Sequence, residues 1–93
     1  MDEASIHVVT VGTSIVGNFR KAKPDVTPEE DALAAFVAAD PEKASAELAA
    51  MAPYLASGDI GDAYLVHTAP GDGELSARVL RRHLHAVHRV EVH

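Results

Sequence analysis

The chain has 93 residues, of which 47% are hydrophobic and 24% charged, an ordinary composition for one small globular domain. It contains no cysteine, which excludes a disulfide framework and a thiolate zinc site. The net charge of −6 argues against direct binding of DNA by the surface as a whole, and no apolar run approaches the ~20 residues of a membrane span. Because residues 1–5 also lack the pattern of a signal peptide, a cytoplasmic protein is expected.

The first predicted element is a strand over residues 6–11, a β-branched apolar run typical of a strand buried on both faces. It stops at Gly12, which lets the backbone turn, and Thr13 and Ser14 then place two hydroxyls at its carboxyl end. Open α/β sheets bind ligands at this edge, and free backbone N–H groups there favour phosphate. The loop therefore predicts a ligand site, although spacing alone favours a plain strand-to-helix turn capped by Thr13 or Ser14.

Three helices are predicted to follow this loop, over residues 15–22, 28–39 and 41–57. Thr27 and Asp40 stand where the second and third helices need an N-cap, and each is followed by a proline, which suits the first helical position. Apolar residues recur at helical spacing in both of these helices, so each is expected to bury one face.

The rest of the chain alternates strand and helix again. The sequence predicts a strand over 63–67, a polar, glycine-rich loop over 68–73, a helix over 74–86 that Asp72 caps, and a strand over 89–92. Such alternation predicts a parallel sheet with right-handed crossovers. About three strands with flanking helices are half of a doubly wound, Rossmann-like α/β fold, so the 93 residues are interpreted as a single domain and as the N-terminal portion of a longer protein.

The loop after the first strand does not meet the known nucleotide-binding patterns. Asn18 and Phe19 stand where a phosphate loop needs lysine and serine or threonine, and the spaced glycines of dinucleotide-binding proteins are missing. His67 closes the second strand, where an imidazole either contacts a ligand or bonds to the backbone. The last helix carries three histidines, His83, His85 and His88. Their spacing is not that of a metal site, so no metal binding is predicted.

Three stretches resemble one family. Residues 9–20, Val-Thr-Val-Gly-Thr-Ser-Ile-Val-Gly-Asn-Phe-Arg, are similar to the N-terminal signature of CRISPR-associated Rossmann-fold (CARF) proteins, in the branch of ring nucleases and ribonuclease sensor domains. Residues 45–48, Ser-Ala-Glu-Leu, resemble a helix element of that family, and residues 65–77 resemble its region after the second strand. The resemblance implies a homodimer that binds cyclic oligoadenylate, the second messenger of type III CRISPR antiviral defence, with no cofactor.

The resemblance also assigns residues to the ligand. It implies contacts from the ends of the first two strands, through Gly12, Thr13, Ser14, Asn18, His67 and Thr68. In the ring-nuclease branch the serine matching Ser14 assists cleavage, in which a 2′-hydroxyl of the ligand attacks its own phosphodiester without a metal. Residues 68–70 lack the acidic residue of the family pattern, and the family's later lysine loop is not among the 93 residues. Two alternatives therefore stay open for a complete protein, a ring nuclease and a sensor that does not cleave, whereas these residues alone are expected to be inactive.

Two other functions remain open from the residues alone. The first is a structural or regulatory α/β module without a nucleotide ligand, in which residues 12–14 only turn the chain. The second is a mononucleotide-binding enzyme, which would bind linear AMP or ATP.

Overall fold

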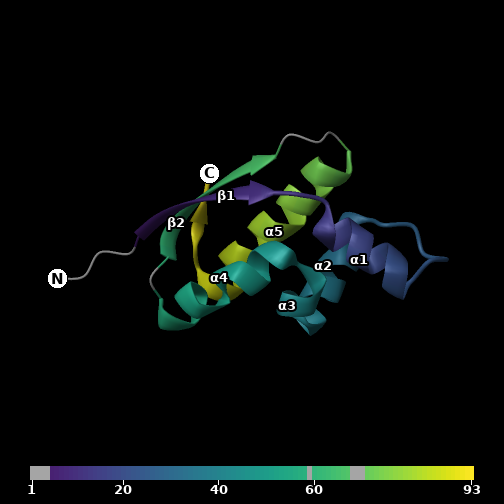
Figure 1. The fold of residues 1–93 in the computed structure, drawn as a ribbon, viewed down its shortest axis with the longest axis horizontal. Coiled ribbons are helices and arrows are strands. Elements are labelled where there is room, and N and C mark those ends of the chain that lie inside the picture. Colours follow the sequence, from purple (N-terminus) through teal and green to yellow (C-terminus); the bar gives the residue numbers. More distant parts are fainter. Residues whose placement is uncertain (1–4, 59, 68–70) are drawn as a thin grey trace.

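A computed structural model describes residues 5–58, 60–67 and 71–93, and Figure 1 shows their arrangement. The elements in chain order are β1 (Ser5–Val11), α1 (Ser14–Ala22), α2 (Glu30–Ala39), α3 (Pro41–Ala44), α4 (Ala46–Ser57), β2 (Ile60–His67), α5 (Asp72–His88) and β3 (Glu91–Val92). The predicted α/β alternation is confirmed. Among these helices none is long and apolar enough to cross a membrane.

The three strands form one parallel sheet in the order β1-β2-β3. Val8 of β1 lies opposite Tyr64 of β2, and Val11 lies opposite His67. The ladder continues one residue past β3, because the His93 N–H donates to the Ala63 carbonyl at 2.8 Å. The prediction of a parallel sheet of three strands with flanking helices is thus confirmed, and β1 and β2 end at the same carboxyl edge.

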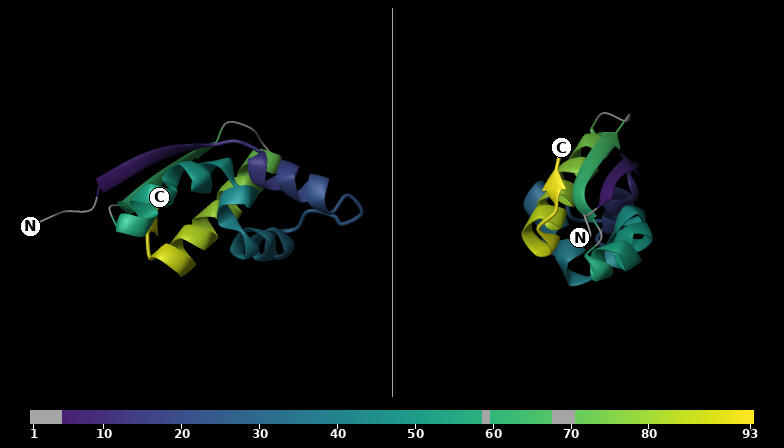
Figure 2. Two further views of the ribbon diagram at one scale, coloured as in Figure 1. Left: turned by 60° about the horizontal axis from the view of Figure 1, so that its bottom comes forward. Right: turned by 90° about the vertical axis from the view of Figure 1, so that its left-hand side faces the viewer.

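All helices lie on one face of the sheet (Figure 2). The order β1-β2-β3 explains this arrangement, because both crossovers move in the same direction and crossovers of one hand then fall on one side. Side chains that alternate along a strand point to opposite faces, and those facing the helices join a single hydrophobic core. Its largest fully buried side chains include Ile15, Phe19, Leu33, Leu48, Leu80 and Leu84.

The opposite face of the sheet carries no helix within the described residues (Figure 2). Val8 is 72% exposed there, Tyr64 43% and Val66 46%. The prediction that the first strand is buried on both faces is therefore wrong for this chain. Its apolar run reflects one face that is packed and one that is open.

Two predicted helix starts differ from the structure. The helix expected over 41–57 is two helices, because Ser45 has extended backbone angles of φ −137° and ψ 123° and its hydroxyl caps α4 by accepting from the Leu48 N–H. The second helix begins at Glu30, not after a Thr27 cap. Glu29 holds the N-cap position with extended angles of φ −126° and ψ 156°, and Asp31 and Glu30 in the first turn pair with Arg82 of α5 at 2.7 and 3.5 Å.

The remaining boundaries differ by a few residues. β2 starts at Ile60 and not at 63, because β1 offers it a full-length partner from Ser5 onward. α5 starts at Asp72 and not at 74, and continues to His88 until Arg89 takes a left-handed conformation at φ 58°. Asp72 is therefore the first helical residue and not the cap.

Candidate ligand site at the carboxyl edge of the sheet

The loop that links β1 to α1 is only two residues long. Gly12 and Thr13 form it and are both exposed, and Thr13 holds the N-cap position of α1 without a side-chain capping bond. The Thr13 carbonyl accepts the Gly17 N–H at 2.9 Å, the first hydrogen bond of the helix. The first N–H groups of an α-helix have no partner within the helix, and they give that end a partial positive charge. The predicted turn thus places the first N–H donors of α1 at the carboxyl edge of the sheet.

Glu47 of α4 lies against this loop and accepts three hydrogen bonds there. The Gly12 N–H donates to its Oε2 at 3.0 Å, and the hydroxyls of Ser14 and Ser45 donate to its Oε1 at 3.0 and 2.9 Å. Burial of the carboxyl group raises its pKa, but backbone and serine hydrogen bonds outweigh burial, so the pKa of Glu47 lies below its ordinary value. The group is therefore an anion at neutral pH and already occupies two donors of the loop.

The Ser14 hydroxyl makes a second contact, because it accepts the Ala46 N–H of α4 at 3.2 Å. Asn18 contacts α3 instead: its side-chain amide donates to the carbonyls of Lys43 and Ala44 at 3.2 and 3.0 Å. Ser14 thus joins α1 to residues 45–48, and Asn18 joins α1 to the end of α3 just before them. The structure gives each a partner within the protein, and their roles as ligand contacts stay predictions.

The end of β2 supplies the other half of the predicted site. His67 lies opposite Val11 in the ladder and is exposed. It lines a cleft of about 230 Å³ together with residues of α5 and β3, among them Arg78 and Arg81. Thr68 lies outside the described residues. The structure therefore brings Gly12, Thr13 and Ser14 together, and places His67 at the same edge but beside α5.

Sequence reasoning assigned no role to Glu47, although it lies in the Ser-Ala-Glu-Leu stretch quoted for the resemblance. A carboxylate 33 residues away from Ser14 carries no local signal of such a contact. The signal available was the joint presence of the two stretches.

No group of three or more histidine and acidic side chains able to hold a metal ion occurs in the described part of the chain. His83 is buried, and its Nε2 has no hydrogen-bond partner among the described residues. The pKa of His83 is lowered, mainly by burial and also by the nearby charge of His88. This imidazole is therefore neutral at pH 7.

Compared with models of protein families, with curated proteins and with solved structures, the chain matches none of them. The geometry of the site itself therefore has to support any assignment of function.

Proposed function

We propose that this chain binds cyclic oligoadenylate at the carboxyl edge of its sheet, as a sensor module of the CARF type. One observation carries the proposal. Two of the stretches that carry the resemblance, 9–20 and 45–48, are joined by hydrogen bonds from Gly12 and Ser14 to Glu47, across 35 and 33 residues of sequence. Two stretches that resemble the family independently are thus in direct contact at the turn after β1.

The chemistry of the loop suits a phosphodiester. Thr13 is exposed with its hydroxyl uncommitted to a helix cap, and it stands at the positive end of α1. Glu47 holds the other side of the loop through Gly12 and Ser14, so it acts as a positioning residue. In this arrangement the ligand uses Thr13 and the first amides of α1, and the Glu47 carboxylate keeps its hydrogen bonds to Gly12 and Ser14. A homodimer would place two such loops against one cyclic ligand.

Calorimetric titration with cyclic tetra-adenylate and with cyclic hexa-adenylate tests the proposal. Thr13→Ala should weaken binding about tenfold, the effect expected for a hydrogen bond to a charged group. Thr10→Ala is the matched control, because Thr10 is an exposed threonine of β1 that lies before the loop. If no cyclic ligand binds the wild-type chain, or if both variants bind as the wild type does, the proposal fails.

The contacts of Ser14 bear on the ring-nuclease interpretation. Its hydroxyl donates to Glu47 and accepts from the Ala46 N–H, so it would have to leave this network to assist cleavage. In a complete protein that cleaves the ring, Ser14→Ala should slow turnover, and unchanged turnover would leave a sensor only.

A structural or regulatory module without a nucleotide ligand is the second candidate. The hydrogen bonds of Gly12, Ser14 and Asn18 favour it, because each already has a partner within the protein. On this interpretation cyclic oligoadenylates leave the melting temperature unchanged, whereas loss of the Ser14 hydroxyl still lowers it.

A further inference from the structure

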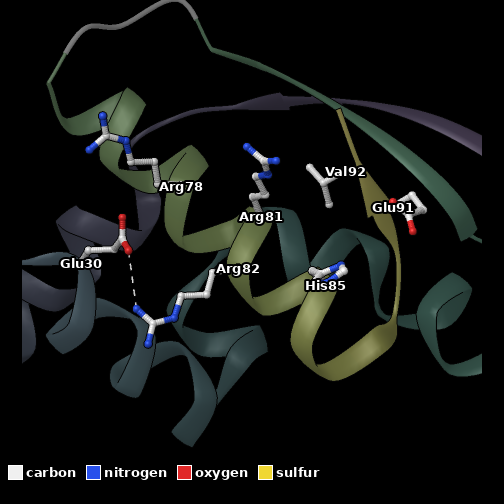
Figure 3. A pocket seen from close by; sticks show the side chains of 7 residues that line it. All are labelled: Glu30, Arg78, Arg81, Arg82, His85, Glu91 and Val92. Carbon is white, nitrogen blue, oxygen red and sulfur yellow. Dashed lines mark ion pairs between the residues drawn. The ribbon is translucent and has the colours of Figure 1, made fainter.

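A groove of about 480 Å³ runs along α5 beside the edge strand β3 (Figure 3). Three arginines and a histidine of α5 line it, together with Glu30 of α2 and with Glu91 and Val92 of β3. None of these residues belongs to the loop after β1. Three of the five arginines of a chain with a net charge of −6 thus gather in one groove.

The three arginines differ in how firmly they are held. Arg82 turns to α2 and pairs with Asp31 at 2.7 Å and with Glu30 at 3.5 Å, so it closes one wall of the groove (Figure 3). Among the residues that the structure describes, Arg78 pairs only with Glu74, one turn earlier on the same helix, in an exposed contact of 2.9 Å. Exposed pairs of this kind contribute little, so Arg78 exchanges its partner at small cost.

Arg81 forms no ion pair with any residue in the described part of the chain. Figure 3 shows its side chain extending toward the sheet, whereas that of Arg78 extends away from Arg81 toward the start of α5, where Glu74 holds it. Arg78 and Arg81 are three residues apart on α5 and therefore neighbours on its surface, so an Arg78 that leaves Glu74 can join Arg81 on one phosphate, whose oxygens accept from several guanidinium donors. The groove therefore has an end suited to a doubly charged anion.

The opposite end of the groove has different chemistry. His85 and Glu91 lie there, with Val92 between them and Arg81 (Figure 3). A carboxylate repels a second phosphate but accepts hydrogen bonds from hydroxyls, and imidazole does so as well. The volume also exceeds what a bare phosphate fills and falls in the range of small-molecule sites, roughly 300–1,000 Å³.

We propose that this groove binds a phosphate monoester carried on a hydroxyl-bearing small molecule, with the phosphate on Arg81 and Arg78 and the hydroxyls on Glu91 and His85. A sugar phosphate and a mononucleotide share this chemistry. Glu30 stays with Arg82 and takes no part in binding.

Amide chemical shifts followed during titration with ribose 5-phosphate, AMP, ribose and inorganic phosphate test the proposal. Ribose 5-phosphate should shift the amides of Arg78, Arg81 and Val92 while residues 12–14 stay unchanged, and ribose should shift none of them. AMP binding much more tightly than ribose 5-phosphate would assign the groove to a nucleotide, and equal binding would assign it to a sugar phosphate; both support the proposal. If inorganic phosphate binds as tightly as either ester, the proposed contacts of Glu91 and His85 with the hydroxyls of the ligand are wrong.

Arg81→Gln should weaken ribose 5-phosphate binding at least about tenfold, and Arg78→Gln severalfold. Arg89→Gln is the matched control, because it removes the same charge from an exposed arginine that does not line the groove. Equal weakening in Arg81→Gln and Arg89→Gln would show a general charge effect and overturn the site. Binding that persists unchanged in Arg81→Gln, or shifts confined to residues 12–14, would overturn it as well.

Discussion

Glu47 joins the loop after β1 to the start of α4, since its carboxylate accepts from the Gly12 N–H and from the hydroxyls of Ser14 and Ser45. Hydrogen bonds to an ionised acceptor are about twice as strong as neutral ones. The site is only partly buried, and water competes for the carboxylate. A single side chain thus determines how firmly the proposed binding loop is held.

Glu47→Gln should therefore lower the free energy of unfolding at pH 7 by about 1–2 kcal/mol, because a neutral amide replaces the charged acceptor. The pKa of Glu47 is lower in the folded chain than the ordinary value of a glutamate in the unfolded chain, so the unfolded chain binds the proton first as the pH falls. The stabilisation is complete above that value and is lost as the pH falls through the folded pKa. Urea unfolding at a series of pH values measures both effects.

Glu42→Gln is the matched control for this variant, since Glu42 is an exposed acid in the first turn of α3. It should change the free energy of unfolding by about 0.3 kcal/mol and by no more than about 1 kcal/mol. This is the usual effect of an exposed charge near a helix end. An acid dependence that is the same in wild type and Glu47→Gln would show that the carboxylate does not stabilise the loop.

At this residue scale the sequence predicted part of the candidate site. Glycine and two hydroxyls after an apolar strand indicated the turn at Gly12, because local backbone chemistry decides a turn. The partners of Ser14 and Asn18 were not predictable, since they lie on α3 and α4 and depend on how the helices pack. The same holds for the groove at Arg81, whose wall on β3 forms only in the folded chain.

Among the helices and strands, α4 shows how one side chain sets an element boundary. Ser45 is fully buried, caps α4 through the Leu48 N–H at 3.2 Å and donates to Glu47 at 2.9 Å. Ser76 on α5 is equally buried, but its hydroxyl has no hydrogen-bond partner among the described residues. We therefore expect the substitution to alanine to change the free energy of unfolding in different ways at the two serines.

Ser45→Ala should lower the free energy of unfolding by about 1–2 kcal/mol, the usual loss for an N-cap. Ser76→Ala should be neutral or slightly stabilising, because a buried hydroxyl without a partner keeps its desolvation cost and alanine removes it. Urea unfolding of both variants in one buffer gives the comparison. Equal losses would mean that packing around the hydroxyls, and not the cap, determines the stability of this region.

The elements themselves were predictable where the local signal was strong. The apolar strand 6–11 and the amphipathic helix at 74–86 were found within a few residues, because their periodicity is clear. The break at Ser45 was missed because residues 41–57 keep helical spacing of apolar residues across it. The start of α2 was placed two residues early because Thr27 and Pro28 have the local features of a helix start, whereas Glu29 takes extended backbone angles in the folded chain.

At the scale of the whole molecule, alternation of strands and helices predicted the parallel sheet but not that its helices share one face. That arrangement follows from the strand order β1-β2-β3, which no local pattern contains. Parallel sheets are usually covered on both faces. Here Val8, Tyr64 and Val66 form an exposed apolar row on the open face. Within the described residues β1 also pairs on one side only, with β2.

These features predict that the chain self-associates as its concentration rises. The unpaired edge of β1 carries no charged or proline residue over 6–11, the devices that usually protect a strand edge. Val8→Lys places a charge in the middle of this strand and beside the apolar row, so it should shift the chain toward the monomer by at least about tenfold in dissociation constant. Sedimentation velocity over a range of concentrations measures the shift.

Val26→Lys is the matched control, because Val26 is an equally apolar side chain, 47% exposed, in the segment between α1 and α2 and away from the sheet. It should leave the association unchanged, since it adds the same charge without touching the strand edge. A wild-type chain that stays monomeric at millimolar concentration would rule out association through β1. Equal dissociation of the two variants would instead attribute the effect to added charge. The homodimer implied by the resemblance would then need a surface other than this strand and its open face.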